Sequence, residues 1–314
     1  MNQKCQIVVS LPMTEERKMR LREAAPDAEF VWREIGKTVE EDIRDAEVMV
    51  GNFDPAILPA AKKVRLYQAG SAGVDAFVRQ GVLPGETRIC SAVGAYNYCV
   101  AEHMLAQTLA CLRHFPELRD AQQRREWVKV PSNGTLRGAL VLVLGIGSIG
   151  QVYAEYCGMM GAHVTGFRRR AVPTPGAEKV CTMEELDDWL PKADVVAMCL
   201  PGTPETHHIM NRERLWKMKP SAVLINCGRG SAVDGEALAD ALEAHVIAAA
   251  ALDVTEPEPL PTDSRLWEMP GCLITPHTAG GLRIPETVDR IVEIAAENLR
   301  HYFAGEPLRN QEKR

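Results

Sequence analysis

The sequence predicts an α/β protein of two domains, each with a parallel sheet covered by helices on both faces. The chain has 314 residues, enough for about two domains of ordinary size. Short apolar runs alternate with helix-like segments, which is typical of parallel sheets. One apolar run ends in a glycine-rich turn, which is typical of a strand–turn–helix unit that binds a nucleotide.

The first block of elements ends near Tyr96. Residues 5–11 (CQIVVSL) predict a buried strand, and residues 13–25 follow with helical spacing, with Thr14 as a cap. Residues 38–46 have a similar helix-like pattern. The other strands of this block are predicted at residues 29–32, 47–52, 64–70 and 87–90.

The second block begins near residue 99. Residues 99–115 predict a long apolar helix, and a polar stretch at 119–138 then leads to an apolar strand at 139–145. The C-terminal segment 285–305 is strongly periodic and predicts a helix. Further strands are predicted at residues 163–167, 195–200, 222–227, 247–254 and 272–277.

Composition restricts the partners and the compartment. A net charge of −6 gives no reason to expect nucleic acid or an anionic membrane. The nine cysteines are scattered, odd in number and without metal-ligand spacing, so we expect a reducing compartment and no metal site. No apolar run approaches the roughly 20 residues of a transmembrane helix, and the N-terminus lacks a signal-peptide core. We therefore expect a cytoplasmic protein.

The glycine-rich turn is the first candidate site. Gly145, Gly147 and Gly150 form the pattern GxGxxG, and residues 148–160 have helical spacing. The first glycine would make the tight turn, the second would let the backbone approach a pyrophosphate, and the third would permit close helix–strand packing. The pyrophosphate would lie at the helix N-terminus, where free N–H groups favour anions. The alternative is a purely structural turn, but the context favours a nucleotide site.

Positive charge follows the next strand. In an NAD-preferring protein, an acidic residue there accepts hydrogen bonds from the adenosine ribose. Here Arg168, Arg169 and Arg170 follow the strand, and no acidic residue occurs until Glu178. Guanidinium groups bind the 2′-phosphate of NADP, so we expect NADP as the preferred cofactor, with NAD as the alternative. Arg168 holds the usual acidic position, Arg169 would assist it, and Arg170 would face solvent. A solvated basic turn is the ordinary structural explanation.

Three polar side chains, Arg229, Glu258 and His277, follow predicted strands of the second block. Ligands of open α/β sheets bind outside the carboxyl ends of the strands, so all three fall where a site is expected. Each has an ordinary explanation, as a surface arginine, a solvated loop carboxylate or a packed loop histidine. Together they suit proton and hydride chemistry, because histidine exchanges a proton near neutral pH, a carboxylate orients it, and arginine binds a carboxylate.

Seven motifs occur in one order along the chain: GSAGVD at 70–75, VAEHMLAQTLA at 100–110, GIGSIG at 145–150, LPGTPET at 200–206, NCGRGSAVD at 226–234, ALDVTEPEPLP at 251–261 and TPHTAG at 275–280. In this order they resemble the D-2-hydroxyacid dehydrogenases, which include glyoxylate/hydroxypyruvate reductases and D-3-phosphoglycerate dehydrogenase. The resemblance implies two Rossmann-like or flavodoxin-like doubly wound parallel-sheet domains with a cleft between them. Residues 1–98 with 282–314 would form the substrate domain, and residues 99–281 the nucleotide-binding domain.

The resemblance also implies a role for individual residues. Arg229, Glu258 and His277 match the catalytic arginine, acid and acid/base histidine. Ala72 and Gly73 match the loop whose backbone binds the substrate carboxylate, and Arg229 and His277 would contact substrate as well. Asp253 would lie near the nicotinamide carboxamide. The expected cofactor-binding positions are Gly145, Gly147, Ser148, Ile149, Gly150, Arg168, Arg169, Pro201, Thr206, Cys227, Gly228, Asp253, His277 and Gly280.

The implied activity is reversible hydride transfer between NADP(H) and a small 2-ketoacid or D-2-hydroxyacid, such as glyoxylate or hydroxypyruvate. A nucleotide-sensing, corepressor-like binding protein on the same fold is the alternative. Oxidation of formate or phosphite is a third reading, disfavoured because the extended N-terminal segments of those branches are absent. PHTAGG replaces a PHIAS-like run, which leaves the substrate unnamed. Specificity is expected from side chains near Ala72, Tyr96, Trp267 and Leu282.

A homodimer is the last expectation. The helix at 99–115 is apolar on more of its surface than one buried face needs, and a polar extension follows at 119–134. In the resembled family such elements pair two cofactor domains. The alternative is a helix buried within its own domain.

Overall fold

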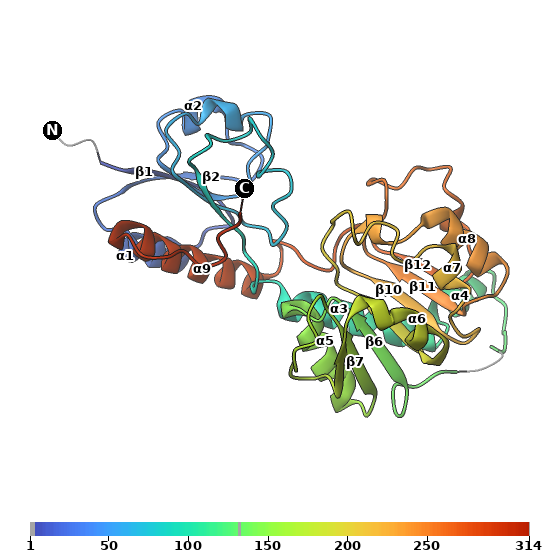
Figure 1. The fold of residues 1–314 in the computed structure, drawn as a ribbon. Coiled ribbons are helices and arrows are strands. Elements are labelled where there is room, and N and C mark those ends of the chain that lie inside the picture. The colour runs from blue at the N-terminus through green and yellow to red at the C-terminus, as the bar shows by residue number, and fades with distance from the viewer. Residues whose placement is uncertain (1–3, 131–132, 314) are drawn as a thin grey trace. The chain divides into compact units, whose positions relative to one another are not determined.

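The computed structural model describes residues 4–130 and 133–313. The chain divides into two compact units, Met1–Tyr96 with Gly281–Arg314, and Asn97–Gly280 (Figure 1). Each unit contains one wholly parallel sheet, so the predicted fold class of two parallel-sheet α/β domains is confirmed. The assignment of a substrate role to one unit and a nucleotide role to the other stays a prediction.

The first unit is built on a five-stranded sheet in the order β2-β1-β3-β4-β5. Successive side chains of β1 point to opposite faces, as a strand requires. Ile7 and Val9 pack against helices α1 (Glu15–Ala24) and α9 (Pro285–Ala304), whereas Val8 packs on the other face with Tyr67. The strands are β1 (Gln6–Ser10), β2 (Glu29–Arg33), β3 (Val48–Gly51), β4 (Leu66–Gln68) and β5 (Arg88–Cys90).

Two helices of this unit begin and pack as their sequences predict. The Thr14 hydroxyl accepts a hydrogen bond from the Arg17 backbone N–H at 3.3 Å, so Thr14 caps α1. Helix α9 lies beside α1, although the two segments are at opposite ends of the chain (Figure 1). The remaining helix, α2, spans Glu40–Ile43. The predicted helices and strands of the first block are therefore all present.

The second unit is built on a seven-stranded parallel sheet in the order β12-β11-β10-β9-β6-β7-β8. Its core strands are almost continuously apolar because helices cover both faces. The strands are β6 (Leu140–Leu144), β7 (His163–Phe167), β8 (Lys179–Cys181), β9 (Val195–Met198), β10 (Val223–Asn226), β11 (Ala249–Leu252) and β12 (Cys272–Ile274).

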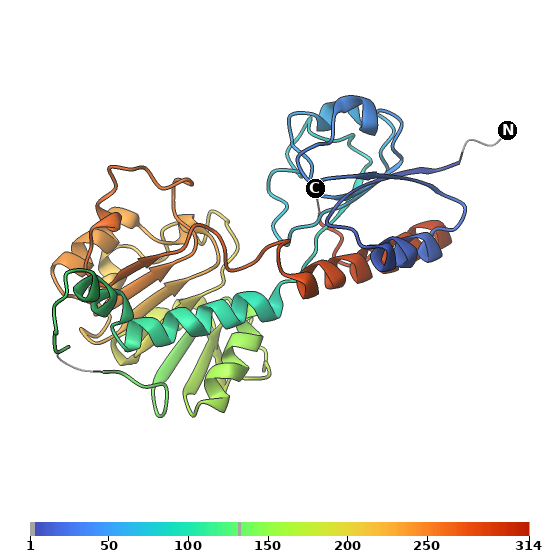
Figure 2. The same ribbon diagram turned by 180° about the vertical axis from the view of Figure 1, so that it is seen from behind.

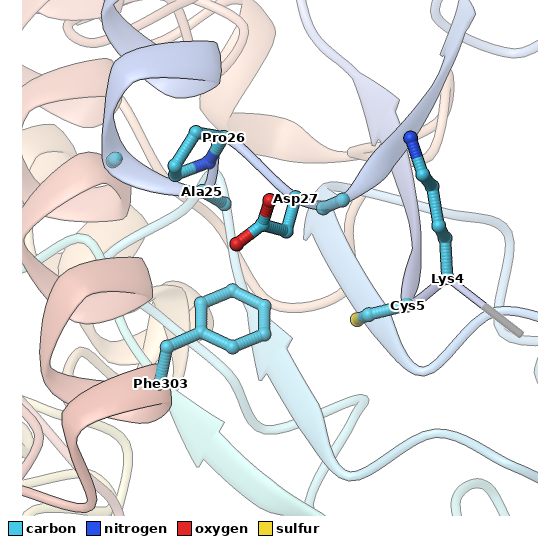
Figure 3. A pocket seen from close by; sticks show the side chains of 8 residues that line it. Lys4, Cys5, Ala25, Pro26, Asp27 and Phe303 are labelled. Atoms are coloured by element: carbon cyan, nitrogen blue, oxygen red, sulfur yellow. The ribbon is translucent and has the colours of Figure 1, made fainter. Parts of the chain in front are cut away.

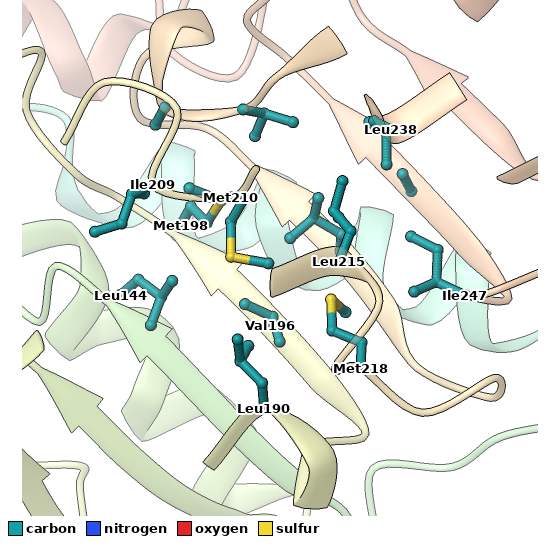
Figure 4. Close-up of a cluster of buried hydrophobic side chains, with 14 of the residues drawn as sticks. Leu144, Leu190, Val196, Met198, Ile209, Met210, Leu215, Met218, Leu238 and Ile247 are labelled. Atoms are coloured by element: carbon teal, nitrogen blue, oxygen red, sulfur yellow. The ribbon is translucent and has the colours of Figure 1, made fainter. Parts of the chain in front are cut away.

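Helices cover the two faces of this sheet differently. Helices α3 (Asn97–Leu112) and α5 (Ser148–Met159) pack together, and α3 runs along β10 and β11 (Figure 2). On the other face, β6 and β9 meet a large cluster that includes Leu190, Leu215 and Leu238 (Figure 4). This face carries α6 (Leu186–Trp189), α7 (Arg212–Leu215) and α8 (Gly235–Glu243).

The structure adds elements that the apolar pattern did not predict. Helix α4 (Phe115–Gln123) forms partly within the stretch expected to be a polar connection. Strand β8 is a three-residue edge strand, too short for a clear period. Short 3₁₀ helices occur at Leu58–Ala60, Met183–Glu185, Leu190–Lys192, Gly230–Ala232 and Arg265–Trp267. Among the described residues, no helix combines the length and the apolar character needed to cross a bilayer.

Candidate active site

The strand order of the second unit creates a switch point between β6 and β9. After β6 the chain moves to β7 and β8 on one side, and then returns to β9 on the other side. Ligands of such sheets bind outside the carboxyl ends of the strands at this point. The loops that follow β6, β7, β9, β10, β11 and β12 all leave this same edge, because the strands are parallel. These loops carry the predicted site residues of the second unit.

The three glycines of the turn have three different local requirements. Gly145 has a left-handed φ of 91°, and a Cβ there would lie 2.7 Å from the Cys199 carbonyl oxygen. A Cβ on Gly150 would lie 2.6 Å from the Gly145 oxygen, because α5 packs closely on the strand. A Cβ on Gly147 would meet no atom within 4 Å. Packing within the protein therefore explains the first and third glycines, but it does not explain the second.

The space beside Gly147 is open, at the N-terminus of helix α5. Gly147 is the N-cap of the 12-residue helix α5, and both Gly147 and Ser148 are exposed. The first N–H groups of a helix lack intrahelical partners and favour an anion. Ile149 is half-buried beside them. The predicted pyrophosphate contacts thus lie together at one exposed helix terminus.

The arginines after β7 differ in exposure. Arg168 is half-buried, and its Nη1 donates a hydrogen bond to the Thr174 hydroxyl at 3.2 Å. Arg169 and Arg170 are exposed. The pKa of Glu205, in the loop after β9, is lowered mainly by a hydrogen bond from the Thr203 hydroxyl, and also by the charge of Arg169. The loop after β9 is therefore near enough to Arg169 for their charges to interact.

Glu178 lies at the other end of β7. Its carboxylate is 2.9 Å from Nδ1 of His163, the first residue of that strand. Arg168 follows the last residue of the strand. The first acidic residue after the arginines is therefore placed away from the carboxyl edge of the sheet.

Glu258 and His277 are hydrogen-bonded to each other. His277 Nδ1 is 2.9 Å from Glu258 Oε2, and Glu258 Oε1 accepts from the Thr255 backbone N–H at 3.1 Å. Both side chains line a cavity of about 450 Å³, together with Trp267. Because Nδ1 faces the carboxylate, Nε2 is the ring nitrogen left for another partner. Sequence-distant residues thus form a carboxylate–imidazole pair in a cavity.

The backbone of His277 is left-handed, with a φ of 52°. Residues other than glycine adopt this conformation rarely, and they keep it where surrounding bonds over-determine it. The His277 backbone N–H donates to the Asp253 carbonyl at 2.7 Å. The residue after β11 therefore holds the backbone of His277, and Glu258 holds its imidazole.

Asp253 has a structural role that the sequence did not predict. Its carboxylate is buried and accepts hydrogen bonds from the Thr275 hydroxyl at 2.7 Å, the Thr278 N–H at 2.8 Å and the Ala279 N–H at 3.0 Å. The residues that donate these hydrogen bonds lie on both sides of His277 in the sequence. The carboxylate expected near the nicotinamide thus also fixes the turn that carries the histidine.

Helix α3 supports the same turn with two polar side chains. His103 Nε2 and Gln107 Nε2 lie 3.0 and 3.1 Å from the Thr275 hydroxyl oxygen. Gln107 Oε1 also accepts a hydrogen bond from the Cys227 thiol at 3.3 Å. Burial raises the pKa of Cys227 well above its usual value, so this thiol is not a nucleophile at neutral pH. The sequence signal that could have revealed this support is a pair of polar residues, His103 and Gln107, four positions apart in a largely apolar helix.

Arg229 lies between two glycines that the backbone of neighbouring loops approaches closely. A Cβ on Gly228 would lie 2.7 Å from Leu200, and a Cβ on Gly230 would lie 1.9 Å from the Thr255 oxygen. Asn226, buried at the end of β10, donates from Nδ2 to the Arg229 carbonyl at 2.9 Å. The loop after β10 is therefore locked from both sides around the arginine.

The hydroxyl of Thr206 closes the loop after β9 through hydrogen bonds within that loop. Thr206 Oγ1 donates to the Pro201 carbonyl at 2.6 Å and accepts from the Thr203 N–H at 3.0 Å. Pro201 is exposed at the carboxyl end of β9, and Gly280 ends the second unit. These predicted cofactor positions therefore shape the loops at the sheet edge.

The predicted substrate residues Ala72 and Gly73 belong to the first unit. They lie in the loop after β4, where the Ser71 hydroxyl donates to the Gly73 carbonyl at 2.7 Å. The Tyr96 hydroxyl donates to the Gly70 carbonyl in the same loop. Leu282 packs against the core beside α9. This loop also lies at the carboxyl edge of its sheet.

Another cavity of the first unit, about 350 Å³, offers no comparable chemistry. Cys5, Asp27 and Phe303 lie around it (Figure 3). Burial, with a smaller effect of Glu47, raises the pKa of the Cys5 thiol to about 12, so the thiol stays protonated at neutral pH. This cavity therefore lacks a carboxylate–imidazole pair like that of Glu258 and His277.

Comparison with known proteins places this geometry in context. Residues 105–279 match the family model described as D-isomer specific 2-hydroxyacid dehydrogenase, NAD binding domain. The chain is 35% identical over 259 residues to a D-3-phosphoglycerate dehydrogenase of Mycobacterium bovis, an alignment that covers 81% of this chain. The chain spans about half of that enzyme, since the alignment covers 48% of its length.

Two solved structures resemble the whole chain. A D-isomer specific 2-hydroxyacid dehydrogenase family protein from Aeromonas salmonicida subsp. salmonicida has a TM-score of 0.87 and 29% identity, covering 99% of both chains. A D-isomer specific 2-hydroxyacid dehydrogenase from Xanthobacter autotrophicus Py2, in complex with NADPH and MES, has a TM-score of 0.82 and 30% identity. That alignment covers 99% of this chain and 98% of the other.

Proposed function

We propose that this chain, which belongs to the D-isomer specific 2-hydroxyacid dehydrogenase family, catalyses the reversible reduction of a small 2-ketoacid to a D-2-hydroxyacid. The proposed cofactor is NADP(H). The observation that carries the proposal is the Glu258–His277 hydrogen bond of 2.9 Å, at the sheet edge that also holds the glycine turn. Steady-state turnover of a panel of 2-ketoacids with each reduced cofactor tests it.

His277 is the proton donor in the proposed reaction. A bound nicotinamide supplies the hydride when the cofactor is present. Glu258 orients the imidazole through Nδ1, so Nε2 is the nitrogen that gives the proton to the developing alkoxide. In the oxidative direction the same nitrogen accepts that proton.

Arg229 binds the substrate anion in the proposed site. A guanidinium group makes charge-assisted hydrogen bonds to a carboxylate and polarises the neighbouring carbonyl oxygen. The positions on both sides of Arg229 are glycines because the backbone of neighbouring loops lies too close for a side chain there. Within the first unit, the backbone N–H groups of Ala72 and Gly73 remain the proposed groups for binding a substrate carboxylate.

NADP(H) is the proposed cofactor because the charges after β7 are positive. Arg168 and Arg169 would bind the 2′-phosphate through charge-assisted hydrogen bonds. Glu178, the first acidic residue downstream, is committed to His163 at the opposite end of the strand. The open helix terminus at Gly147 and Ser148 would hold the pyrophosphate.

The substrate is proposed to be small, with glyoxylate and hydroxypyruvate as the first compounds to test. The cavity of about 450 Å³ beside His277 is lined by Leu260, Ile274 and Trp267 on its apolar side. Trp267 is fixed there because its indole N–H donates to the Pro261 carbonyl at 2.8 Å. Absence of turnover with every ketoacid, with nucleotide binding retained, would instead favour a nucleotide-sensing role.

We also infer a homodimer and a cytoplasmic location. Helix α3 buries its apolar face against α5, β10 and β11 of its own unit, so α3 supports the dimer less than its sequence suggested. Exposed apolar residues occur just beyond it instead, with Trp127 99% and Phe115 60% exposed. Large exposed aromatic side chains are enriched at protein interfaces. The cytoplasmic location rests on the nine cysteines, all free in the structure.

A further inference from the structure

Two histidines and a glutamate gather beside the catalytic loops without belonging to the proposed reaction. Glu256 Oε2 is 3.5 Å from His207 Nε2 and 3.3 Å from His208 Nε2. The three possible ligand atoms all lie within 4.8 Å of one another. The histidines follow the closed turn after β9, and the glutamate is in the loop after β11.

The backbone holds both histidines in place. The His208 N–H donates to the Ser231 carbonyl at 2.7 Å, and His208 has a left-handed φ of 46°. The His207 N–H donates to the Thr203 carbonyl at 3.1 Å. The two rings are stacked with centroids 4.0 Å apart. Adjacent residues therefore bring the same ring nitrogen, Nε2, close to one carboxylate oxygen. A metal ion lies in the plane of each imidazole that binds it, so ligation through both Nε2 atoms requires one ring to rotate out of the stack.

The two separations to the carboxylate oxygen match a metal site better than a hydrogen bond. A charge-assisted N–H···O bond is about 2.7–2.9 Å long, and the pairs His277–Glu258 and His163–Glu178 of this chain both have 2.9 Å. In a tetrahedral zinc site, Zn–N bonds of about 2.0–2.1 Å and Zn–O bonds of about 2.0–2.2 Å place neighbouring ligand atoms about 3.3–3.5 Å apart. The two distances to Glu256 Oε2 are 3.5 and 3.3 Å.

We propose that His207, His208 and Glu256 form a binding site for a divalent transition metal of the zinc type. Two imidazoles and one carboxylate favour zinc over magnesium or calcium, which prefer oxygen ligands throughout. All three side chains are partly exposed, at 52%, 39% and 44%, so the fourth position is open to water. The metal cross-links the loop after β9 to the loop that continues to Glu258.

Cobalt absorption tests the site directly. Tag-free protein, dialysed against a chelator and then freed of it, is titrated with Co²⁺ and then with Zn²⁺. We expect the intense visible absorption of four-coordinate Co²⁺, saturating at one Co²⁺ per chain and abolished by Zn²⁺. Calorimetric titration with Zn²⁺ gives the same stoichiometry. A wild-type chain without this absorption would overturn the proposal.

Variants assign the ligands. Glu256→Gln keeps the shape of the side chain, and His208→Asn keeps a residue that tolerates a left-handed backbone. Each should weaken Zn²⁺ binding at least roughly 100-fold, since loss of outer partners alone costs about 10–100-fold. His163→Ala, which removes an exposed histidine also paired with a glutamate, should bind Zn²⁺ like the wild type. Equal binding by Glu256→Gln, His208→Asn and the wild type would contradict the site.

Discussion

At the residue scale, the orientation of one imidazole ring depends on contacts made by the loop after β11 and by helix α3. Glu258 faces His277 Nδ1, the Asp253 carbonyl accepts from the His277 N–H, and the Asp253 carboxylate holds the residues that follow. His103 reaches the same turn through Thr275. A proton donor held this firmly transfers its proton without a costly search for the right geometry.

Replacing His277 removes the proposed proton donor. His277→Ala should lower kcat by about 10²–10⁴-fold, which is the usual contribution of a positioned acid or base. Cofactor binding should change little, and fluorescence titration with NADPH measures it separately. His163→Ala is the matched control, because it removes an exposed histidine that is also paired with a glutamate. Near-normal kcat in His277→Ala would exclude His277 from the mechanism.

Glu258→Gln should lower activity more than it affects the fold. The amide keeps the size of the side chain but removes the negative charge that lies 2.9 Å from His277 Nδ1, so the proposed proton donor loses its charged orienting partner and kcat should fall. Steady-state kcat and the unfolding midpoint of the variant and the wild type provide the comparison. An unchanged kcat would argue against the pair.

Arg168→Ala tests the choice of cofactor at one side chain. Loss of one charged hydrogen bond costs roughly 1.5–3 kcal/mol, so KM for NADPH should rise about tenfold or more. KM for NADH should change little, because NADH lacks the 2′-phosphate. Arg170→Ala, in the exposed neighbour, is the control and should behave like the wild type. A similar rise for both cofactors would show that Arg168 has a different role.

At the element scale, the strand–turn–helix unit of β6 and α5 separates two glycines that packing requires from one that packing does not. Gly145 and Gly150 have no room for a Cβ, whereas Gly147 has no atom within 4 Å of that position. The close approach of the Gly145 backbone to the end of β9 and the packing of α5 require Gly145 and Gly150. The proposed role of Gly147 is to leave space for the pyrophosphate at the helix N-terminus.

Two alanine substitutions distinguish these requirements. Gly150→Ala should destabilise the cofactor-free protein by about 1–3 kcal/mol, the usual cost of overpacking. Gly147→Ala should leave thermal unfolding unchanged but weaken NADPH binding, because its methyl group occupies the space beside the helix N-terminus. Unfolding midpoints and NADPH titrations of both variants give the four values needed. Unchanged NADPH affinity in Gly147→Ala would place the pyrophosphate elsewhere.

The sequence was enough to predict which residues and elements form the site, but not most of the contacts between them. Arg229, Glu258 and His277 were predicted together because parallel strands end at one edge of a sheet. The support from His103 was not predicted, since that contact joins residues 172 positions apart. Asp253 was recognised for its position only, because nothing in the local sequence shows which N–H groups a buried carboxylate will accept. The His207–His208–Glu256 cluster was missed for the same reason.

At the scale of the whole molecule, the proposed homodimer has a measurable mass. Light scattering at micromolar concentration should give twice the chain mass of 34.6 kDa. Trp127→Asp should shift the mass toward the monomer, because a charge in an apolar interface is costly. Phe303→Asp, which changes an exposed aromatic residue of the first unit, is the control. A wild-type mass of one chain would contradict the dimer.

The most direct test of the proposed function is steady-state reduction of a ketoacid panel by the wild-type chain. Glyoxylate, hydroxypyruvate, pyruvate, phenylpyruvate and 2-ketoisocaproate are each assayed with NADPH and with NADH. We expect turnover of at least one small ketoacid, with a higher kcat/KM for NADPH than for NADH and a D-2-hydroxyacid as product. A higher kcat/KM for NADH would contradict the role of the arginines, and no turnover with either cofactor would contradict the reaction itself.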